Sequence, residues 1–419
     1  MKTLIVRPLT ESKISTVIVI DALDECKDDE PASAILSVLG QLVTEIPNTK
    51  FFVTSRPEPR IREGFRLPLL AKTADVFVLH EVEPSQVNRD IRLLFKQKLL
   101  EMRGRRRVGD DWPTEGQLNH LCDRAAGLFV YAMATIRFVD QKNKNPKKQL
   151  DRLLQSPESG FEGRTRLRAN LTLDTLYTSI LLEAFEDDDL EDDPNVRSIL
   201  GAVVLAVNPL SSSSIAALLD LDPEDVFPLL SSVHSLLVLR DDIDYPVQPF
   251  HKSFPDFIVD PVRCTNPRFR VSPSDQHAQL VVGCLELMNR TLEKNMCHLP
   301  EAVANSDIDD MEERIKEYIN PALRYACRSW HMHFIHGHAT STFIPKITAA
   351  LHRFLKTKFL FWLEVLSVLG SVRNAVDALQ VAVDQLEVCP DSMVVSSEIP
   401  EDLFRSHLLL TSPVTALVS

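Results

Sequence analysis

Residues 15–26, STVIVIDALDEC, constrain the fold of this chain more than any other stretch. Residues 17–20 are all β-branched and show no polar alternation, which is typical of a strand buried on both faces of a parallel α/β sheet. Asp21, Asp24 and Glu25 follow directly. Such sheets bind ligands at the carboxyl ends of their strands, where carboxylate oxygens hold Mg²⁺ through water and beside a phosphate. We therefore expect Asp21 to lie at a strand tip that faces a ligand.

The segments after this strand predict a βαβ unit. Residues 29–46 carry apolar side chains at helical spacing, and residues 51–54 form a second apolar run that is followed by Ser55 and Arg56. A strand, a helix and a strand in this order normally pair as parallel neighbours joined by a crossover helix. Residues 74–82 are a candidate third strand. The N-terminal part of the chain is therefore predicted to belong to a parallel α/β sheet.

Most of the remaining chain has a helical pattern. Residues 83–154 have apolar side chains at helical spacing, and the basic stretches at residues 103–107 and 141–149 are interpreted as solvated loops. From residue 274 onward nearly every segment is predicted to be helical. The very apolar residues 359–370 are interrupted by a glutamate and are interpreted as a buried helix rather than a membrane span.

Between these helical regions lies a candidate winged helix. Three short helices are predicted at residues 196–207, 212–219 and 223–237, followed by an extended pair of strands. Residues 181–260 also contain 17 Asp and Glu against three Lys and Arg, a net charge of −14. Because binding to DNA phosphates requires positive charge, this module is not expected to bind nucleic acid.

Composition limits the class of protein. The chain has 419 residues, of which 44% are hydrophobic and 25% are charged, as in soluble proteins with two to four domains. Its seven cysteines include no C-x-x-C pair, which favours a reducing compartment over a disulfide framework. No run reaches the roughly 18 apolar residues that a membrane helix needs. We therefore expect a cytoplasmic protein without a membrane partner.

Two segments together carry a family resemblance. VIVIDALDEC at residues 17–26, followed by FFVTSRPEP at residues 51–59, resembles the Walker B and sensor 1 segments of NACHT-type (STAND) signalling NTPases, especially the fungal proteins similar to the N-terminal region of nephrocystin-3. The resemblance continues through GLFVYA (127–132), YTSIL (177–181), PFHKSFPDFIVDP (249–261) and LRYACRSWHMH (323–333), so it extends along most of the chain.

The resemblance implies a role for each residue at the predicted strand ends. Asp21 corresponds to the Walker B aspartate that holds Mg²⁺ through water, and Asp24 and Glu25 stand where the family orients or activates the attacking water. Ser55 and Arg56 would contact the nucleotide, with Arg56 as the sensor 1 arginine facing the γ-phosphate. A planar, permanently charged guanidinium suits phosphate oxygens and the charge of phosphoryl transfer. Without the resemblance, the three carboxylates are equally well explained as a polar loop.

The resemblance also reaches the candidate winged helix. His251 corresponds to the histidine that contacts the β-phosphate of ADP in the closed state of related switches; a histidine without a ligand remains an equal alternative. Phe129 departs from the proline of the Gly-x-Pro turn of related helical lids. The implied fold is α/β: an incomplete P-loop NTPase (AAA+/STAND-like) parallel sheet at residues 1–82, a helical lid at 83–155, a winged helix at 170–262 and an all-α region at 270–419.

One expected motif is missing from the sequence. No segment matches G-x-x-x-x-G-K-[ST], the phosphate-binding loop called Walker A. We therefore expect the chain to begin partway through the nucleotide-binding domain, with a weakened sheet and impaired catalysis. Mg²⁺ with ATP or ADP would be the family's cofactors, bound weakly or not at all by this chain.

Two functions remain open at this stage. The first is a fragment of an ATP-gated signalling switch, and the second is a non-catalytic interaction module. The partners would be further copies of the chain or full-length NACHT proteins. His331, His333, His336 and His338 form a histidine-rich stretch, but their spacing does not place zinc ligands on one helical face, so no zinc site is expected.

Overall fold

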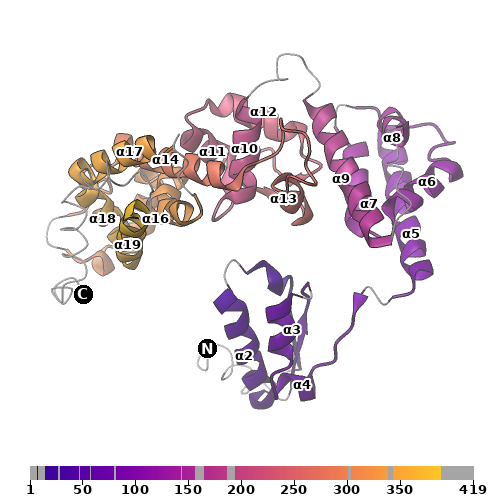
Figure 1. The fold of residues 1–419 in the computed structure, drawn as a ribbon, viewed down its shortest axis with the longest axis horizontal. Coiled ribbons are helices and arrows are strands. Elements are labelled where there is room, and N and C mark those ends of the chain that lie inside the picture. The colour runs from indigo at the N-terminus through magenta and orange to yellow at the C-terminus, as the bar shows by residue number, and fades with distance from the viewer. Residues whose placement is uncertain are drawn as a thin grey trace. The chain divides into compact units, whose positions relative to one another are not determined.

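The computed structural model describes residues 7, 15–26, 29–46, 48–56, 58–79, 82–142, 144–155, 165–185, 194–300, 303–337 and 343–387. The chain divides into two compact units, Met1–Glu83 and Pro84–Ser419. Each unit has its own hydrophobic core, and each is described by itself (Figure 1).

The smaller unit contains the predicted βαβ arrangement. Strand β1 (Thr16–Ile20) pairs in parallel with β2 (Thr49–Val53), so that Ile20 lies opposite Val53. The 3-10 turn η2 (Leu23–Glu25) and helix α2 (Asp29–Glu45) connect the two strands. Helices α3 (Pro59–Phe65) and α4 (Leu70–Thr73) follow β2.

The helices of this unit cover one face of the sheet. Helices α2 and α3 approach closely at Gly64, where an added Cβ would lie 2.3 Å from Leu36 Cδ1. Ile20, Phe51 and Val53 of the strands pack against the helices. The buried residues of this core are Leu23, Leu36, Leu39, Ile61 and Leu70.

Two predictions for this unit are wrong. Strand β1 is not buried on both faces, because Val17 and Val19 are each 63% exposed, on the same face as the exposed Phe52. Residues 74–79 form no strand, although strand-forming side chains led to that prediction. A strand requires a neighbour for its backbone hydrogen bonds, and the sheet described in this unit has two strands. Residues 80 and 81 lie outside the described residues.

The larger unit begins with five helices: α5 (Pro84–Arg106), α6 (Glu115–Ala125), α7 (Phe129–Val139), α8 (Pro146–Gln155) and α9 (Thr165–Ala184). Thr114 begins α6 with a capping box, since its side chain accepts from the Gln117 amide and Gln117 accepts from the Thr114 amide. The loop prediction for the basic stretches is partly wrong. Residues 103–106 form the last turn of α5, where positively charged side chains interact favourably with the negative end of the helix dipole. Residues 146–149 form the beginning of α8.

The next segment combines short helices with a small sheet. Its order is α10 (Pro194–Leu205), β3 (Leu210–Ser211), α11 (Ser212–Leu219), α12 (Pro223–Ser232), β4 (Leu237–Val238), β5 (Pro246–Pro249) and α13 (Ser253–Ile258). The strands form an antiparallel sheet in the order β3-β5-β4. Helix α12 ends five residues before the predicted limit, because the chain turns there to enter β4.

The described residues that follow form the α-helices α14 (Pro273–Thr291), α15 (Met311–Tyr318), α16 (Pro321–His336), α17 (Ile344–Thr357), α18 (Phe359–Val368) and α19 (Arg373–Glu387). The prediction of a buried helix at residues 359–370 is confirmed in part, since Trp362, Val365 and Leu366 of α18 are buried and Leu360 is 72% exposed. Among the described residues, no helix is both long enough and apolar enough to cross a bilayer.

Candidate functional site

The carboxyl ends of β1 and β2 meet around Thr54. The Thr54 amide donates to Ile20 O, and the Thr54 carbonyl accepts from the Leu23 amide, each at 2.9 Å. The Thr54 hydroxyl accepts from the Ala22 amide at 2.9 Å and donates to the Asp21 carboxylate. Residues 21–23 therefore wrap around a single threonine, which fixes the exposed Asp21 at the strand tip.

The turn after β1 contains a strained residue. Ala22 has φ 52° and ψ 51°, a left-handed conformation that costs a non-glycine residue about 1–2 kcal/mol. Such a conformation persists where the surrounding hydrogen bonds determine it, and here Thr54 supplies them. The strain lies between Asp21 and Asp24, the first two carboxylates of the predicted site.

Asp24 is the buried carboxylate of this group. Its side chain is 3% exposed and accepts from the Arg56 amide at 2.9 Å, with the Ser55 hydroxyl at 3.4 Å. The Arg56 guanidinium Nε lies 3.7 Å from the same carboxylate. The Asp24 carbonyl accepts from Arg60 at 2.9 Å. Asp24 thus holds the segment after β2 in place and orients Arg56, whose side chain is 42% exposed.

The structure therefore gathers four of the six predicted residues. Asp21, Asp24, Ser55 and Arg56 converge at one sheet edge, and Glu25 lies beside them with an exposed side chain. Among the described residues, no three His, Cys, Asp or Glu side chains are arranged to hold a metal ion. The oxygen of Asp21 fits Mg²⁺ bound through water, a mode in which a nucleotide must supply further oxygens.

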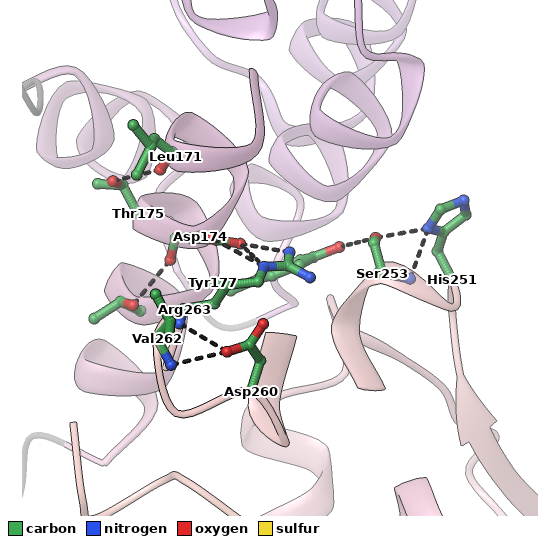
Figure 2. A network of polar contacts seen from close by, with 10 residues as sticks. Leu171, Asp174, Thr175, Tyr177, His251, Ser253, Asp260, Val262 and Arg263 are labelled. Atoms are coloured by element: carbon green, nitrogen blue, oxygen red, sulfur yellow. Dashed lines mark hydrogen bonds and ion pairs between the residues drawn. The ribbon is translucent and has the colours of Figure 1, made fainter. Parts of the chain in front are cut away.

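His251 belongs to the larger unit and has a separate polar network, which Figure 2 shows. Its Nδ1 atom accepts from the Ser253 amide at 3.1 Å and lies 2.6 Å from the Ser253 hydroxyl. That hydroxyl lies 2.7 Å from the Tyr177 hydroxyl of α9. One turn away on α9, Asp174 binds Arg263 through both guanidinium Nε and Nη2, the latter at 2.6 Å. His251 is thus connected to α9 rather than isolated at the surface.

The sequence did not reveal these connecting residues. Tyr177 and Ser253 lie within segments that carry the family resemblance, which was the available signal, whereas Asp174 and Arg263 lie outside them. Arg137 was also missed. It lies on α7 and donates to three backbone carbonyls between α12 and β5. No sequence pattern predicts this interaction.

Comparison with known proteins gives two matches. The family model "Nephrocystin 3, N-terminal" matches residues 1–56. The vegetative incompatibility protein HET-E-1 of Podospora anserina is 22% identical over 389 residues, which cover 87% of this chain and 26% of that protein. These similarities support a NACHT-like fungal protein. The chain spans about a quarter of the length of this relative, and no solved structure matches it.

The matches bear on the family resemblance and leave the site residues untested. The family match includes β1, β2 and the residues that gather around Thr54. The roles of Asp21, Asp24, Glu25, Ser55, Arg56 and His251 remain predictions, as do the winged helix and the domain limits within the larger unit.

Proposed function

We propose that this chain is part of a NACHT-type signalling protein whose conformation responds to ATP or ADP. The observation that supports the proposal is the convergence of Asp21, Asp24, Ser55 and Arg56 at the carboxyl ends of two parallel strands. This edge is where ligands of α/β sheets bind. The similarity to a vegetative incompatibility protein adds a signalling context, which we extend to this chain as part of the proposal.

The proposed roles follow from the chemistry of each group. Asp21 holds Mg²⁺ through water, while Ser55 and Arg56 contact nucleotide phosphates. Asp24 keeps Arg56 oriented through the backbone amide, and Glu25 acts on the attacking water from its exposed position. Separating a buried, orienting carboxylate from an exposed, water-facing one gives the two acidic residues distinct tasks.

We propose that this 419-residue chain binds nucleotide weakly. The backbone amides and the lysine of a glycine-rich loop supply most phosphate contacts in P-loop proteins, and the printed sequence has no such motif. The remaining contacts from Ser55, Arg56 and a hydrated Mg²⁺ are few. We therefore expect affinity well below that of an intact nucleotide site.

Calorimetric titration of the chain with Mg²⁺ and ATP tests the proposal. We expect weak binding that Arg56→Ala and Asp21→Asn each reduce by about tenfold, the effect of losing roughly 1.4 kcal/mol. The matched controls Arg62→Ala and Asp75→Asn change exposed residues of the same unit and should leave binding unchanged. Equal affinity in all five proteins would reject the assigned site.

A second candidate function is a non-catalytic interaction module that binds full-length relatives or further copies of the chain. The observation that favours it is the exposed apolar face of the small sheet, formed by Val17, Val19 and Phe52. Large exposed apolar patches are typical of interaction surfaces. Under this alternative, Val19→Lys weakens self-association in sedimentation velocity, while Arg56→Ala has no effect on it.

We place the protein in the cytoplasm. The six cysteines within the described residues are unpaired: Cys26, Cys122, Cys264, Cys284, Cys297 and Cys327. Free thiols of this number are usual in a reducing compartment.

A further inference from the structure

Thr54 forms hydrogen bonds with four consecutive residues of the turn that follows β1. Its amide donates to Ile20 O and its carbonyl accepts from the Leu23 amide, each at 2.9 Å. Its hydroxyl oxygen accepts from the Ala22 amide at 2.9 Å, because an amide can only donate. The hydroxyl proton is therefore available to the Asp21 carboxylate, which accepts it. A single side-chain oxygen thus connects the strained Ala22 to Asp21.

The hydroxyl of Thr54 is the part of this arrangement that supports the strained turn through a side chain. A left-handed conformation is unfavourable at Ala22, which has a Cβ, so hydrogen bonds must hold it. Ala22 donates its N–H to the Thr54 hydroxyl. Thr54 is half-buried, and its β-branched side chain has few rotamers, which keeps the hydroxyl in place. Loss of the hydroxyl would leave the Ala22 amide without this acceptor and let the turn relax.

The same turn determines the direction of the Arg56 backbone. Ala22 directly precedes the 3-10 turn η2, which carries Asp24 with its side chain directed inward. The Asp24 carboxylate accepts from the Arg56 amide at 2.9 Å. Asp21 and Arg56 therefore lie at the two ends of one series of contacts that runs through Thr54, Ala22 and Asp24.

We propose that Thr54 is a positioning residue that couples the occupancy of Asp21 by a divalent cation to the orientation of Arg56. Asp21 is exposed, and the Thr54 hydroxyl engages one of its two carboxylate oxygens. The other oxygen is left for a hydrated cation, a mode of binding that Mg²⁺ prefers. The choice of Mg²⁺ as the cation rests on the proposed function.

The coupling has a defined direction. A cation withdraws negative charge from the Asp21 carboxylate and so weakens the hydrogen bond that this carboxylate accepts from Thr54. Hydrogen bonds in a chain polarise one another, so a hydroxyl that donates less strongly is also a weaker acceptor for the Ala22 amide. A cation at Asp21 therefore loosens the turn and, through Asp24, the contact to the Arg56 amide.

Amide hydrogen exchange, followed by NMR in protein that contains isotope-labelled arginine, measures this contact directly. The Arg56 signal is assigned by its loss in Arg56→Lys. Thr54→Val keeps the shape of the side chain without the hydroxyl, and the Arg56 amide should exchange about tenfold faster, the effect of losing one hydrogen bond. Thr54→Ser keeps a hydroxyl and should remain close to the parent rate.

Two controls separate positioning from general stability. Thr73→Val removes a hydroxyl of the same unit that donates to Leu69 O at 2.8 Å, and it should leave the Arg56 rate unchanged. The Arg62 amide, which donates to Glu58 O at 3.0 Å at the start of α3, is the internal reference and should keep its rate in every variant. An Arg62 rate that rises together with the Arg56 rate would assign the effect to unfolding and overturn the role of Thr54.

The variant Ala22→Gly tests the part played by strain. Glycine adopts the left-handed conformation without a steric penalty, so Ala22→Gly added to Thr54→Val should return the Arg56 exchange rate toward the parent value. A double variant that exchanges as fast as Thr54→Val, or a Thr54→Val protein that exchanges at the parent rate, would overturn the inference. These measurements need no ligand and do not depend on the proposed function.

Titration with Mg²⁺ alone, at constant ionic strength, tests the coupling. Mg²⁺ at tens of millimolar should raise the Arg56 exchange rate about twofold in the parent and in Thr54→Ser, and should have no effect in Thr54→Val or Asp21→Asn. An unchanged parent rate would overturn the coupling, while the titrations with ATP would still decide the proposed function. If Mg²⁺ acts as expected but Arg56→Ala leaves ATP binding unchanged, the proposed site for the nucleotide fails and the coupling stands.

Discussion

Arg137 joins two parts of the larger unit through a single side chain. Its guanidinium donates to the carbonyls of His234 at 2.6 Å, Ser235 at 3.1 Å and Leu237, and its Cζ atom lies 4.4 Å from the centre of the Phe250 ring. The three carbonyl groups are 97 to 100 residues away in sequence. Burial removes water from around the Arg137 guanidinium and thereby lowers its pKa. The carbonyls and the ring take the place of that water around the cation. The contact fixes α7 against the loop that enters β4.

Arg137→Met should destabilise the larger unit by about 2–4 kcal/mol. Methionine keeps much of the length but leaves the three carbonyls without their donor, and an unsatisfied buried acceptor costs about 1–3 kcal/mol before relaxation. The measurement is the midpoint of thermal unfolding followed by tryptophan fluorescence. Arg89→Met, at an exposed position of α5, is the control and should shift the midpoint by less than one degree or so. Equal midpoints for the two variants would show that Arg137 is dispensable.

The residues around Thr54 mark the limit of what the sequence predicted at this scale. Spacing placed Asp21 and Arg56 at neighbouring strand ends because parallel strands align their carboxyl ends. It did not predict that Asp24 turns inward to accept from the Arg56 amide, because that contact depends on the left-handed turn at Ala22. The three carboxylates are chemically similar, and the path of the backbone decides which of them is buried. Asp24 is buried, whereas Asp21 and Glu25 are exposed.

Secondary structure elements were predictable where their pattern is local. Strand β1, helix α2 and strand β2 form as expected, since hydrophobic spacing and pairing within one βαβ unit determine them. Residues 74–79 have the composition of a strand but no pairing neighbour among the described residues, and the composition carries no information about that. The exposure of Val17 and Val19 was likewise not predictable from composition, because it depends on which segments cover the sheet.

A chain of hydrogen bonds that is partly buried connects helices α14 and α16. The Val207 amide donates to Tyr325 Oη at 2.9 Å, Tyr325 Oη lies 2.6 Å from His333 Nε2, and His333 Nδ1 lies 2.8 Å from His277 Nδ1. In the neutral state each group has a partner: Tyr325 donates to His333, and His333 donates to His277. If either histidine gains a proton while these contacts stay in place, His333 Nε2 carries a hydrogen and donates it to Tyr325. The Tyr325 hydroxyl then has no acceptor for its own proton along this chain. The contact between the helices therefore favours neutral histidines.

Acid should weaken this junction. Burial, with the nearby His336 as a second cause, lowers the pKa of His277 from 6.5 to about 4. The unfolded chain thus binds a proton more readily than the folded chain, so stability is lost as pH falls from about 6.5 to 4 and is nearly constant above that range. The ring is partly exposed, so we expect a loss of about 1–2 kcal/mol.

Thermal unfolding at several pH values between 7 and 4 measures this loss. His277→Asn keeps an acceptor in the place of Nδ1 and removes the titrating ring, so its unfolding midpoint should decline less steeply with acid. His120→Asn, at an exposed position of α6, should retain the slope of the parent. Parallel slopes for all three proteins would assign the acid sensitivity to other groups.

At the scale of the whole molecule, the two units differ greatly in the size of their cores. Among the described residues, the buried cluster between the sheet and the helices of the smaller unit has five members, and the sheet has two strands with Val17, Val19 and Phe52 exposed. Two-stranded sheets and small cores are marginally stable. The larger unit has a continuous core that extends from α5 to α19. We therefore expect unequal stabilities for the two units.

The three tryptophans make this difference measurable, because Trp112, Trp330 and Trp362 are all buried in the larger unit. Tryptophan fluorescence therefore reports the unfolding of the larger unit, whereas far-ultraviolet circular dichroism reports both. We expect the dichroism signal to begin falling at a lower temperature than the fluorescence signal.

A variant in each core tests this assignment. Leu36→Ala removes a fully buried side chain next to Gly64 and should destabilise the smaller unit by about 2–5 kcal/mol. It should move the early dichroism phase and leave the fluorescence midpoint in place. The counterpart Leu99→Ala, in the core of the larger unit, should move the fluorescence midpoint instead. A single transition that both variants shift equally would mean that the two cores unfold as one.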